Sequence, residues 1–271
     1  MPALPIEPSS TANRPSLPAA PVLLEASALT KFYGASCVVE DVSLSIHRGE
    51  TLGLVGESGS GKSTIARMLL RLVEPTSGKI LYDGTDLLTL NLRDLRQMRR
   101  RLQIVFQDPF AALNPRMRIR DILSEPFAIH RVQMPERLAA HLEDLLHHVG
   151  LDASALPRYP HEFSGGQRQR INIARALALK PEFLVLDEPV SALDVSIGAQ
   201  VINLLRELQH THGLTYLFIS HSMPLVRYLC DRVAVLKRGR IVEIGDALKV
   251  CDHPAEEYTQ RLIAATPEVP A

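Results

Sequence analysis

The amino-acid sequence predicts an α/β fold: a parallel sheet covered by helices, with an antiparallel β layer and an inserted α-helical subdomain. Continuous apolar runs at 51–55 and 183–186 are typical of strands that are buried on both faces, as in a parallel sheet. Residues 22–50 instead alternate apolar and polar side chains, which favours short antiparallel strands with one covered face. From 108 to about 163 the leucines recur at helical spacing.

The strand at 51–55 runs directly into a glycine-rich loop. Gly56, Gly61, Lys62 and Ser63 fit the pattern G-x-x-x-x-G-K-[ST], and a helix is expected over 64–72. Such a loop turns its backbone N–H groups around a phosphate chain at a helix N-terminus. Lys62 is expected to reach the outer phosphates, and the Ser63 hydroxyl is expected to bind Mg²⁺. The pattern predicts a P-loop NTPase (RecA-like) core whose nucleotide-binding residues include Gly56, Glu57, Ser58, Gly59, Ser60, Gly61, Lys62, Ser63 and Thr64.

Two acidic residues follow the second apolar run, Phe-Leu-Val-Leu at 183–186. Asp187, at the end of a buried strand, is expected to hold the Mg²⁺ that bridges the outer phosphates. Glu188 is expected beside the γ-phosphate, where a carboxylate can orient and deprotonate the attacking water. An isolated Asp-Glu-Pro triplet is more typical of a turn at a strand end. The apolar run and the phosphate loop favour the catalytic interpretation.

Residues 164–167, Ser-Gly-Gly-Gln, predict a second anion site at a helix N-terminus. Ser164 is a residue type favoured as an N-cap, and Ile171 and Ala174 begin an apolar pattern at helical spacing. Free N–H groups and the positive end of the helix dipole would face outward there. A loop that simply precedes a helix explains the glycines, but it does not explain the run Gln-Arg-Gln-Arg at 167–170.

Gln107 and His221 each follow an apolar run, at 102–106 and 214–220 respectively. Each is ambiguous alone, and a single histidine after a strand is more often structural than catalytic. Open α/β sheets, however, bind their ligands at the carboxyl ends of the strands. This position favours a role for His221 in the site.

Taken in order, these motifs resemble those of the ATP-binding subunits of ABC transporters, over about Val22 to Asp246. The resemblance implies ATP hydrolysis with ATP and Mg²⁺, with Glu188, His221 and Gln107 as catalytic residues. It implies Ser63, Gln107 and Asp187 as metal ligands. The aromatic residue that stacks on adenine would be Tyr33, although a core-facing aromatic at a strand end is an alternative. In this family the signature residues Ser164, Gly165, Gly166 and Gln167 contact the γ-phosphate bound by another protomer, and the D-loop matches Ser191, Ala192, Leu193 and Asp194.

The resemblance also implies partners and a location. These are a second ATP-binding subunit, in a homo- or heterodimer, two membrane permease subunits and, indirectly, a solute-binding protein, at the cytoplasmic face of the inner membrane. The stretches 105–116, 162–170 and 257–267 look like the peptide and nickel importer branch. The branch's His-Pro-Tyr-Thr is altered here to Ala-Glu-Glu-Tyr-Thr at 255–259, which puts the exact solute in doubt. A related cassette of a soluble phosphonate-degrading complex is the alternative.

Composition limits the other function classes. The 271 residues include 30 basic and 30 acidic side chains, so charge indicates no binding to nucleic acid. No run approaches the roughly 20 apolar residues of a membrane span. Six prolines among residues 1–21 and no apolar core of a signal peptide favour a disordered tail there. The predicted organisation is this tail, an ATP-binding domain over 22–246 with a helical subdomain at about 108–163, and a C-terminal tail over 247–271.

Overall fold

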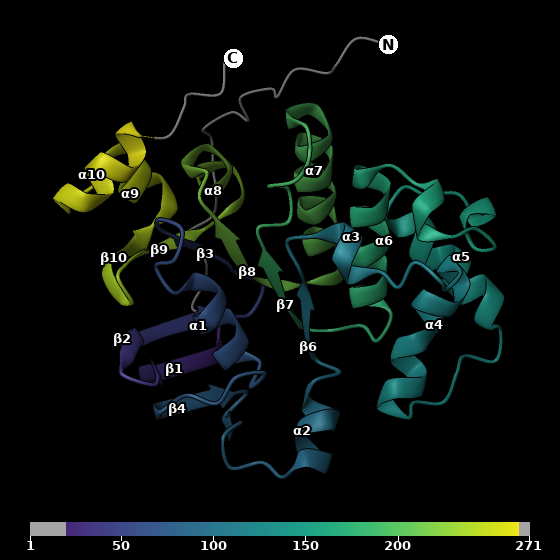
Figure 1. The fold of residues 1–271 in the computed structure, drawn as a ribbon, viewed down its shortest axis with the longest axis horizontal. Coiled ribbons are helices and arrows are strands. Elements are labelled where there is room, and N and C mark those ends of the chain that lie inside the picture. The colour runs from purple at the N-terminus through teal and green to yellow at the C-terminus, as the bar shows by residue number, and fades with distance from the viewer. Residues whose placement is uncertain (1–19, 266–271) are drawn as a thin grey trace.

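A computed structural model describes residues 20–265 of the chain. All but the last two residues of the predicted N-terminal tail lie outside the described residues, as do residues 266–271. The predicted layers are present: a mostly parallel sheet, an antiparallel sheet beside it, and a helical subdomain (Figure 1).

The central sheet has six strands in the order β10-β9-β3-β8-β7-β6, and all neighbours are parallel except the hairpin β9–β10. These strands are β3 (Thr51–Val55), β6 (Leu102–Val105), β7 (Phe183–Asp187), β8 (Thr215–Ser220), β9 (Arg232–Lys237) and β10 (Arg240–Asp246). The second sheet has the order β2-β1-β4-β5 and is antiparallel. Its strands are β1 (Val22–Tyr33), β2 (Ser36–His47), β4 (Ser77–Tyr82) and β5 (Thr85–Asp86).

Both faces of the central sheet are buried, which explains its continuous apolar runs. Every residue of β3, β7 and β8 is buried. Successive side chains of a strand point to opposite faces. In β7, Leu184 and Leu186 therefore belong to one hydrophobic cluster, and Phe183 and Val185 belong to the other. The second cluster joins the central sheet to the antiparallel sheet through α1.

Helices cover the two faces of the central sheet, and the helical subdomain lies beyond its edge strand β6 (Figure 1). The helical subdomain packs against α6 and contains α3 (Pro109–Ala112), α4 (Ile119–His130), α5 (Leu138–His148) and the short 3₁₀ helices η1 (Ala153–Ala155) and η2 (Pro160–Glu162). The other helices are α1 (Lys62–Leu69), α2 (Leu92–Met98), α6 (Gly165–Leu177), α7 (Val195–His212), α8 (Met223–Leu229), α9 (Ala247–Asp252) and α10 (Glu257–Ala264).

Several boundaries differ from the sequence-based expectation. Helix α1 begins at Lys62 because Gly61, at φ 109°, supplies the left-handed N-cap, and it ends before Arg71, which has φ 49°. Strand β6 ends at Val105, one residue early. Residues 22–47 form two long strands with bulges instead of short ones.

A proline usually indicates a break in a helix, but Pro126 lies inside α4. A proline removes one backbone hydrogen bond of a helix. The buried side chains of Ile122, Leu123 and Phe127 hold α4 on the core in spite of that loss. At the other end of the chain, α9 and α10 fall in the segment expected as a C-terminal tail.

Candidate nucleotide site

The site lies at one edge of the central sheet, where parallel strands end together. Val55 pairs with Ser220, and Asp187 pairs with Ile219, so the loops after β3, β7 and β8 start side by side. This register brings together the phosphate loop, the acidic pair and His221, although they are far apart in sequence. Gln107 follows the neighbouring strand β6.

Glycines are required in the phosphate loop for steric reasons. A Cβ atom on Gly56, which has φ 151°, would lie 2.2 Å from the carbonyl oxygen of Leu236. A Cβ atom on Gly61 would lie 2.8 Å from the carbonyl oxygen of Val38. The loop therefore follows a tight path against β9 and β2 that a larger residue would block. The Gly239 N–H also donates to the Ser60 carbonyl oxygen at 2.9 Å, so the β9–β10 turn supports the loop.

Lys62 is folded back into the phosphate loop. Its ammonium group donates to the carbonyl oxygens of Gly56 at 2.8 Å and of Glu57 at 2.9 Å. Burial lowers the pKa of Lys62, while the charges of Glu188 and Asp187 oppose that shift. No carboxylate of the described residues forms a salt bridge with this ammonium group within 4.0 Å. A phosphate chain would supply the missing negative charge, so the loop fits a nucleotide.

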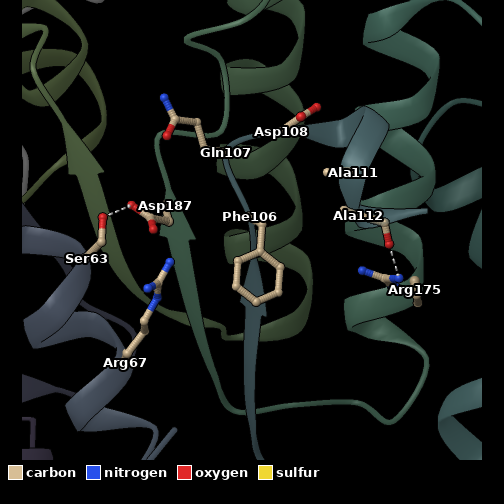
Figure 2. A pocket seen from close by; sticks show the side chains of 9 residues that line it. All are labelled: Ser63, Arg67, Phe106, Gln107, Asp108, Ala111, Ala112, Arg175 and Asp187. Atoms are coloured by element: carbon tan, nitrogen blue, oxygen red, sulfur yellow. Dashed lines mark hydrogen bonds between the residues drawn. The ribbon is translucent and has the colours of Figure 1, made fainter. Parts of the chain in front are cut away.

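Ser63 and Asp187 form a pair of oxygen ligands beside the loop. The Ser63 hydroxyl donates to Oδ1 of Asp187 at 3.2 Å (Figure 2). Burial raises the pKa of Asp187, and the hydrogen bond from Ser63 opposes that shift. Hydroxyl and carboxylate oxygens are the ligand types that Mg²⁺ prefers, so the donor set fits a hard divalent cation.

Glu188 is held between two polar side chains. Its Oε2 accepts a hydrogen bond from Nε2 of Gln107 at 3.1 Å and lies 3.4 Å from Nδ1 of His221. The Glu188 side chain is 19% exposed, whereas His221 is 63% exposed. This carboxylate is thus oriented from two sides and still reachable by water. Such an arrangement can position a water molecule and accept its proton.

The backbone of Glu188 is unusual, because its φ of 48° is left-handed. A left-handed backbone is unfavourable for residues with a Cβ atom. The residues that nevertheless adopt it cluster at functional sites. The N–H of Glu188 donates to Ile219, and its carbonyl oxygen accepts from the N–H and the hydroxyl of Ser191. These three hydrogen bonds hold the turn that aims the carboxylate, and they give D-loop residue Ser191 a structural role.

A pocket of about 490 Å³ adjoins this site between α1 and the helical subdomain (Figure 2). Two arginines that sequence reasoning missed line it. Arg67 lies four residues after Ser63 on α1. Residues four apart lie on the same face of a helix, so its position beside Ser63 could have been predicted from the sequence. Arg175 donates to the carbonyl oxygen of Ala112 at 2.7 Å and ties α6 to α3. The lining residues are Ser63, Arg67, Phe106, Gln107, Asp108, Ala111, Ala112, Arg175 and Asp187.

The signature residues form the expected N-terminal cap of α6. The Ser164 hydroxyl accepts from the N–H of Gln167 at 3.3 Å, and the Gln167 side chain accepts from the N–H of Ser164 at 3.0 Å. A Cβ atom on Gly166 would lie 2.3 Å from the Ile197 side chain, so α6 and α7 approach closely there. Gly165 lies next to Leu193 of the D-loop, while Ala192 and Asp194 are exposed.

The structure does not bring the signature residues to the phosphate loop of the same chain. Figure 1 shows α1 and α6 on opposite sides of β6 and β7. Helix α6 contacts β6, α3, α4, α5 and α7.

Tyr33, at the end of β1, is 50% exposed, and the Lys31 ammonium lies 5.0 Å from its ring centroid. The ring therefore does not face the core.

The sheet, the G-x-x-x-x-G-K-S loop and the Ser63–Asp187 pair define a P-loop nucleotide-binding protein. The family model for ABC transporters matches residues 39–191. The oligopeptide transport ATP-binding protein OppF of Streptococcus mutans is 52% identical over 231 residues, which cover 85% of this chain and 75% of OppF. The corresponding protein AppF of Bacillus subtilis is 53% identical over 84% of this chain and 70% of AppF.

Two solved structures are similar in fold to this chain. CbiO1 of Clostridium perfringens, part of the CbiONQ transporter complex, matches with a TM-score of 0.77 at 28% identity, over 86% of this chain and 91% of CbiO1. The dimeric ATP-binding cassette MJ0796, bound to ADP and phosphate, matches with a TM-score of 0.75 at 29% identity, over 83% of this chain and 98% of MJ0796.

This chain belongs to the ABC transporter family, as an ATP-binding subunit with ATPase activity. The predicted fold class is confirmed. Within residues 20–265, no helix has the length and apolar character needed to cross a membrane.

Proposed function

We propose that this chain is the ATP-hydrolysing subunit of an importer for peptides or a related solute. The hydrolytic part rests on one observation: the Glu188 carboxylate, held by Gln107 at 3.1 Å and near His221 at 3.4 Å, next to the Ser63–Asp187 pair. The solute class rests on similarity to OppF and AppF, which are oligopeptide transport proteins by name and share about half of their residues with this chain over more than four-fifths of its length. These relatives do not support the phosphonate-degrading alternative.

In the proposed reaction, each group at the strand ends has one task. Lys62 and the loop N–H groups bind the outer phosphates. Ser63, Gln107 and Asp187 would hold Mg²⁺, which neutralises developing charge on the phosphates. Glu188 orients the attacking water and accepts its proton, while His221 contacts the γ-phosphate and keeps the carboxylate in place. Tyr33 stacks on the adenine ring.

The complete site is proposed to need a second ATP-binding subunit. The cap of α6 presents exposed Ser164 and Gln167 on a different side of the chain from its own phosphate loop. A helix N-terminus is suited to bind anionic phosphate. MJ0796 is a dimer in a post-hydrolysis state, and this supports the same arrangement here. The γ-phosphate would then lie between Lys62 of one protomer and Ser164 of the other.

The importer is proposed to include two permease subunits, which would hold this chain at the cytoplasmic face of the membrane. CbiO1 is part of the ABC transporter complex CbiONQ, and this supports the proposal. The docking surface is proposed to include residues 108–125, of which Asp108, Ala111 and Ala112 line the pocket shown in Figure 2. Movement of Gln107 upon ATP binding would reach this segment directly.

The test is deletion of the gene in its native host, with uptake of a radiolabelled dipeptide and a tripeptide as readouts. We expect uptake to fall to background and to return with the wild-type chain, but not with Glu188→Gln. Affinity purification of the wild-type chain from solubilised membranes should recover permease subunits. Normal peptide uptake in the deletion strain, together with recovery of soluble enzyme subunits instead of permeases, would contradict the proposal.

A further inference from the structure

One side chain of the C-terminal helix α10 reaches the phosphate loop. The Tyr258 hydroxyl accepts a hydrogen bond from the backbone N–H of Glu57 at 3.4 Å. Tyr258 is only 8% exposed, and the Lys237 ammonium lies 4.9 Å from its ring centroid. Packing thus fixes the ring in a position where its hydroxyl points at the loop.

The same peptide unit is held from its other side by Lys62. The Lys62 ammonium donates to the carbonyl oxygen of Gly56 at 2.8 Å. The Gly56 carbonyl and the Glu57 N–H belong to one planar peptide unit, and in the usual trans form they point in opposite directions. Tyr258 and Lys62 therefore hold opposite edges of a single peptide plane.

This plane needs an external constraint. Gly56 has φ 151°, in a region that glycine tolerates and other residues avoid, and glycine imposes little restriction of its own on the adjoining peptide. If the peptide rotates, the Gly56 carbonyl leaves Lys62. The ammonium group then loses one of the two carbonyl partners that set its place in the loop.

The C-terminal segment is itself fixed to the domain. The N–H groups of Ala255 and Glu256 both donate to the carboxylate of Glu243 on β10, at 2.9 and 3.3 Å. Thr259, next to Tyr258, is fully buried. Burial and the nearby Glu57 carboxylate raise the pKa of Tyr258, so its phenol stays neutral near pH 7. The hydroxyl is therefore a stable hydrogen-bonding group supported by a rigid anchor.

We propose that Tyr258 is a positioning residue of the nucleotide site. By holding the Gly56–Glu57 peptide, its hydroxyl keeps Lys62 in place to bind phosphate. Helix α10 is then part of the ATP site and not an appendage to it. This inference rests on the proposed role of Lys62 in ATP binding.

The test compares Tyr258→Phe with a matched control, Tyr228→Phe, in the purified full-length chain. Both changes remove one hydroxyl and keep the ring, but the Tyr228 hydroxyl lies 2.8 Å from Oδ1 of Asn203 on α7, away from the loop. We expect Tyr258→Phe to raise KM for ATP about two- to tenfold, the size expected for one lost hydrogen bond, with kcat within about twofold. Hydrogen exchange at the Glu57 amide should accelerate in Tyr258→Phe alone.

An unchanged KM and unchanged exchange at Glu57 in Tyr258→Phe would overturn the inference, as would an equal rise of KM in Tyr228→Phe. Lys62→Ala, measured in parallel, separates this inference from the proposal beneath it. If Lys62→Ala binds ATP normally, the proposed role of Lys62 is wrong and the inference fails with it. If only Tyr258→Phe is normal, the role of Lys62 stands and the positioning by Tyr258 is wrong.

Discussion

The hydroxyl of Ser63 donates a hydrogen bond to the carboxylate of Asp187 at 3.2 Å, across 124 positions of sequence. Ser63 lies in the first turn of α1, which follows β3, and Asp187 ends β7, with β8 between the two strands. The bond thus joins the phosphate loop to the acidic pair. It also brings Glu188, the next residue, to the same edge of the sheet.

Replacing Glu188 with Gln is expected to lower kcat for ATP hydrolysis by about 10²–10⁴-fold, because the amide cannot accept a proton from water. ATP affinity, measured with a fluorescent analogue, should stay close to that of the wild-type chain. The variant should also accumulate as an ATP-dependent dimer on size-exclusion chromatography. Glu207→Gln, an exposed position on α7, is the control. Near wild-type turnover in Glu188→Gln would exclude this carboxylate as the base.

The split site predicts recovery of activity when two inactive variants are mixed. Ser164→Arg places a guanidinium group where the partner's γ-phosphate would bind, and Lys62→Ala removes a phosphate ligand. Each variant alone should have little ATPase activity. In a mixed dimer, one composite site carries both defects and the other carries neither, so mixing should restore part of the activity. No recovery, with mixed dimers detected by crosslinking, would mean that each chain uses its own signature residues.

Charge reversal on the proposed docking surface is expected to separate transport from hydrolysis. Arg116 and Arg120 are both exposed on the segment after Gln107, whereas Arg118 is half-buried and its guanidinium lies 5.6 Å from the Tyr159 ring centroid. Arg116→Glu with Arg120→Glu should therefore leave basal ATPase activity of the purified subunit within about twofold, because no catalytic group is touched. Peptide uptake in cells and recovery of permeases should fall.

The matched control is Lys79→Glu with Arg93→Glu, which makes the same charge change at exposed positions outside this segment. Normal assembly and uptake in the Arg116/Arg120 variant would show that permeases dock elsewhere.

A charge cluster far from the ATP site predicts a pH-dependent stability. Glu182 accepts hydrogen bonds from Arg101 at 2.7 Å and from Arg48 at 2.9 Å, and these bonds lower the pKa of Glu182 below its usual 4.5. A lowered pKa in the folded state stabilises the protein above the unfolded pKa, and this contribution disappears as pH falls through the folded pKa. Glu182→Gln should therefore unfold more easily at pH 7, by about 1 kcal/mol for a half-exposed network.

Urea denaturation at several pH values checks this. The difference in unfolding free energy between wild type and Glu182→Gln should be constant from pH 7 to about pH 5 and shrink below pH 4. Glu74→Gln, which removes the single ion pair of the exposed Glu74 with Arg71, is expected to change stability less. A difference that persists at acid pH would assign the stabilisation to packing instead of charge.

Local patterns in the sequence were sufficient for much of the fold. The runs at 51–55 and 183–186 indicated buried strands because apolar residues on both faces require cover on both sides, and β3 and β7 have those residues. Ser164 indicated the start of α6 because its side chain can cap free N–H groups. Pro126 alone would indicate a helix break, but tertiary packing of α4 outweighs the one hydrogen bond that a proline removes.

The sequence by itself determined the chemical types in the site: the glycines, Lys62 and Ser63 are recognisable from their spacing, and the acidic pair from the apolar run before it and the phosphate loop elsewhere in the chain. Only the tertiary structure decided which groups meet. The contact of Glu188 with Gln107 and His221 depends on the strand order β3-β8-β7-β6, and the contact of Tyr258 with Glu57 depends on how α10 returns to β9. Spacing along a chain fixes local conformation, whereas contacts between distant residues follow from the burial of apolar surface throughout the domain.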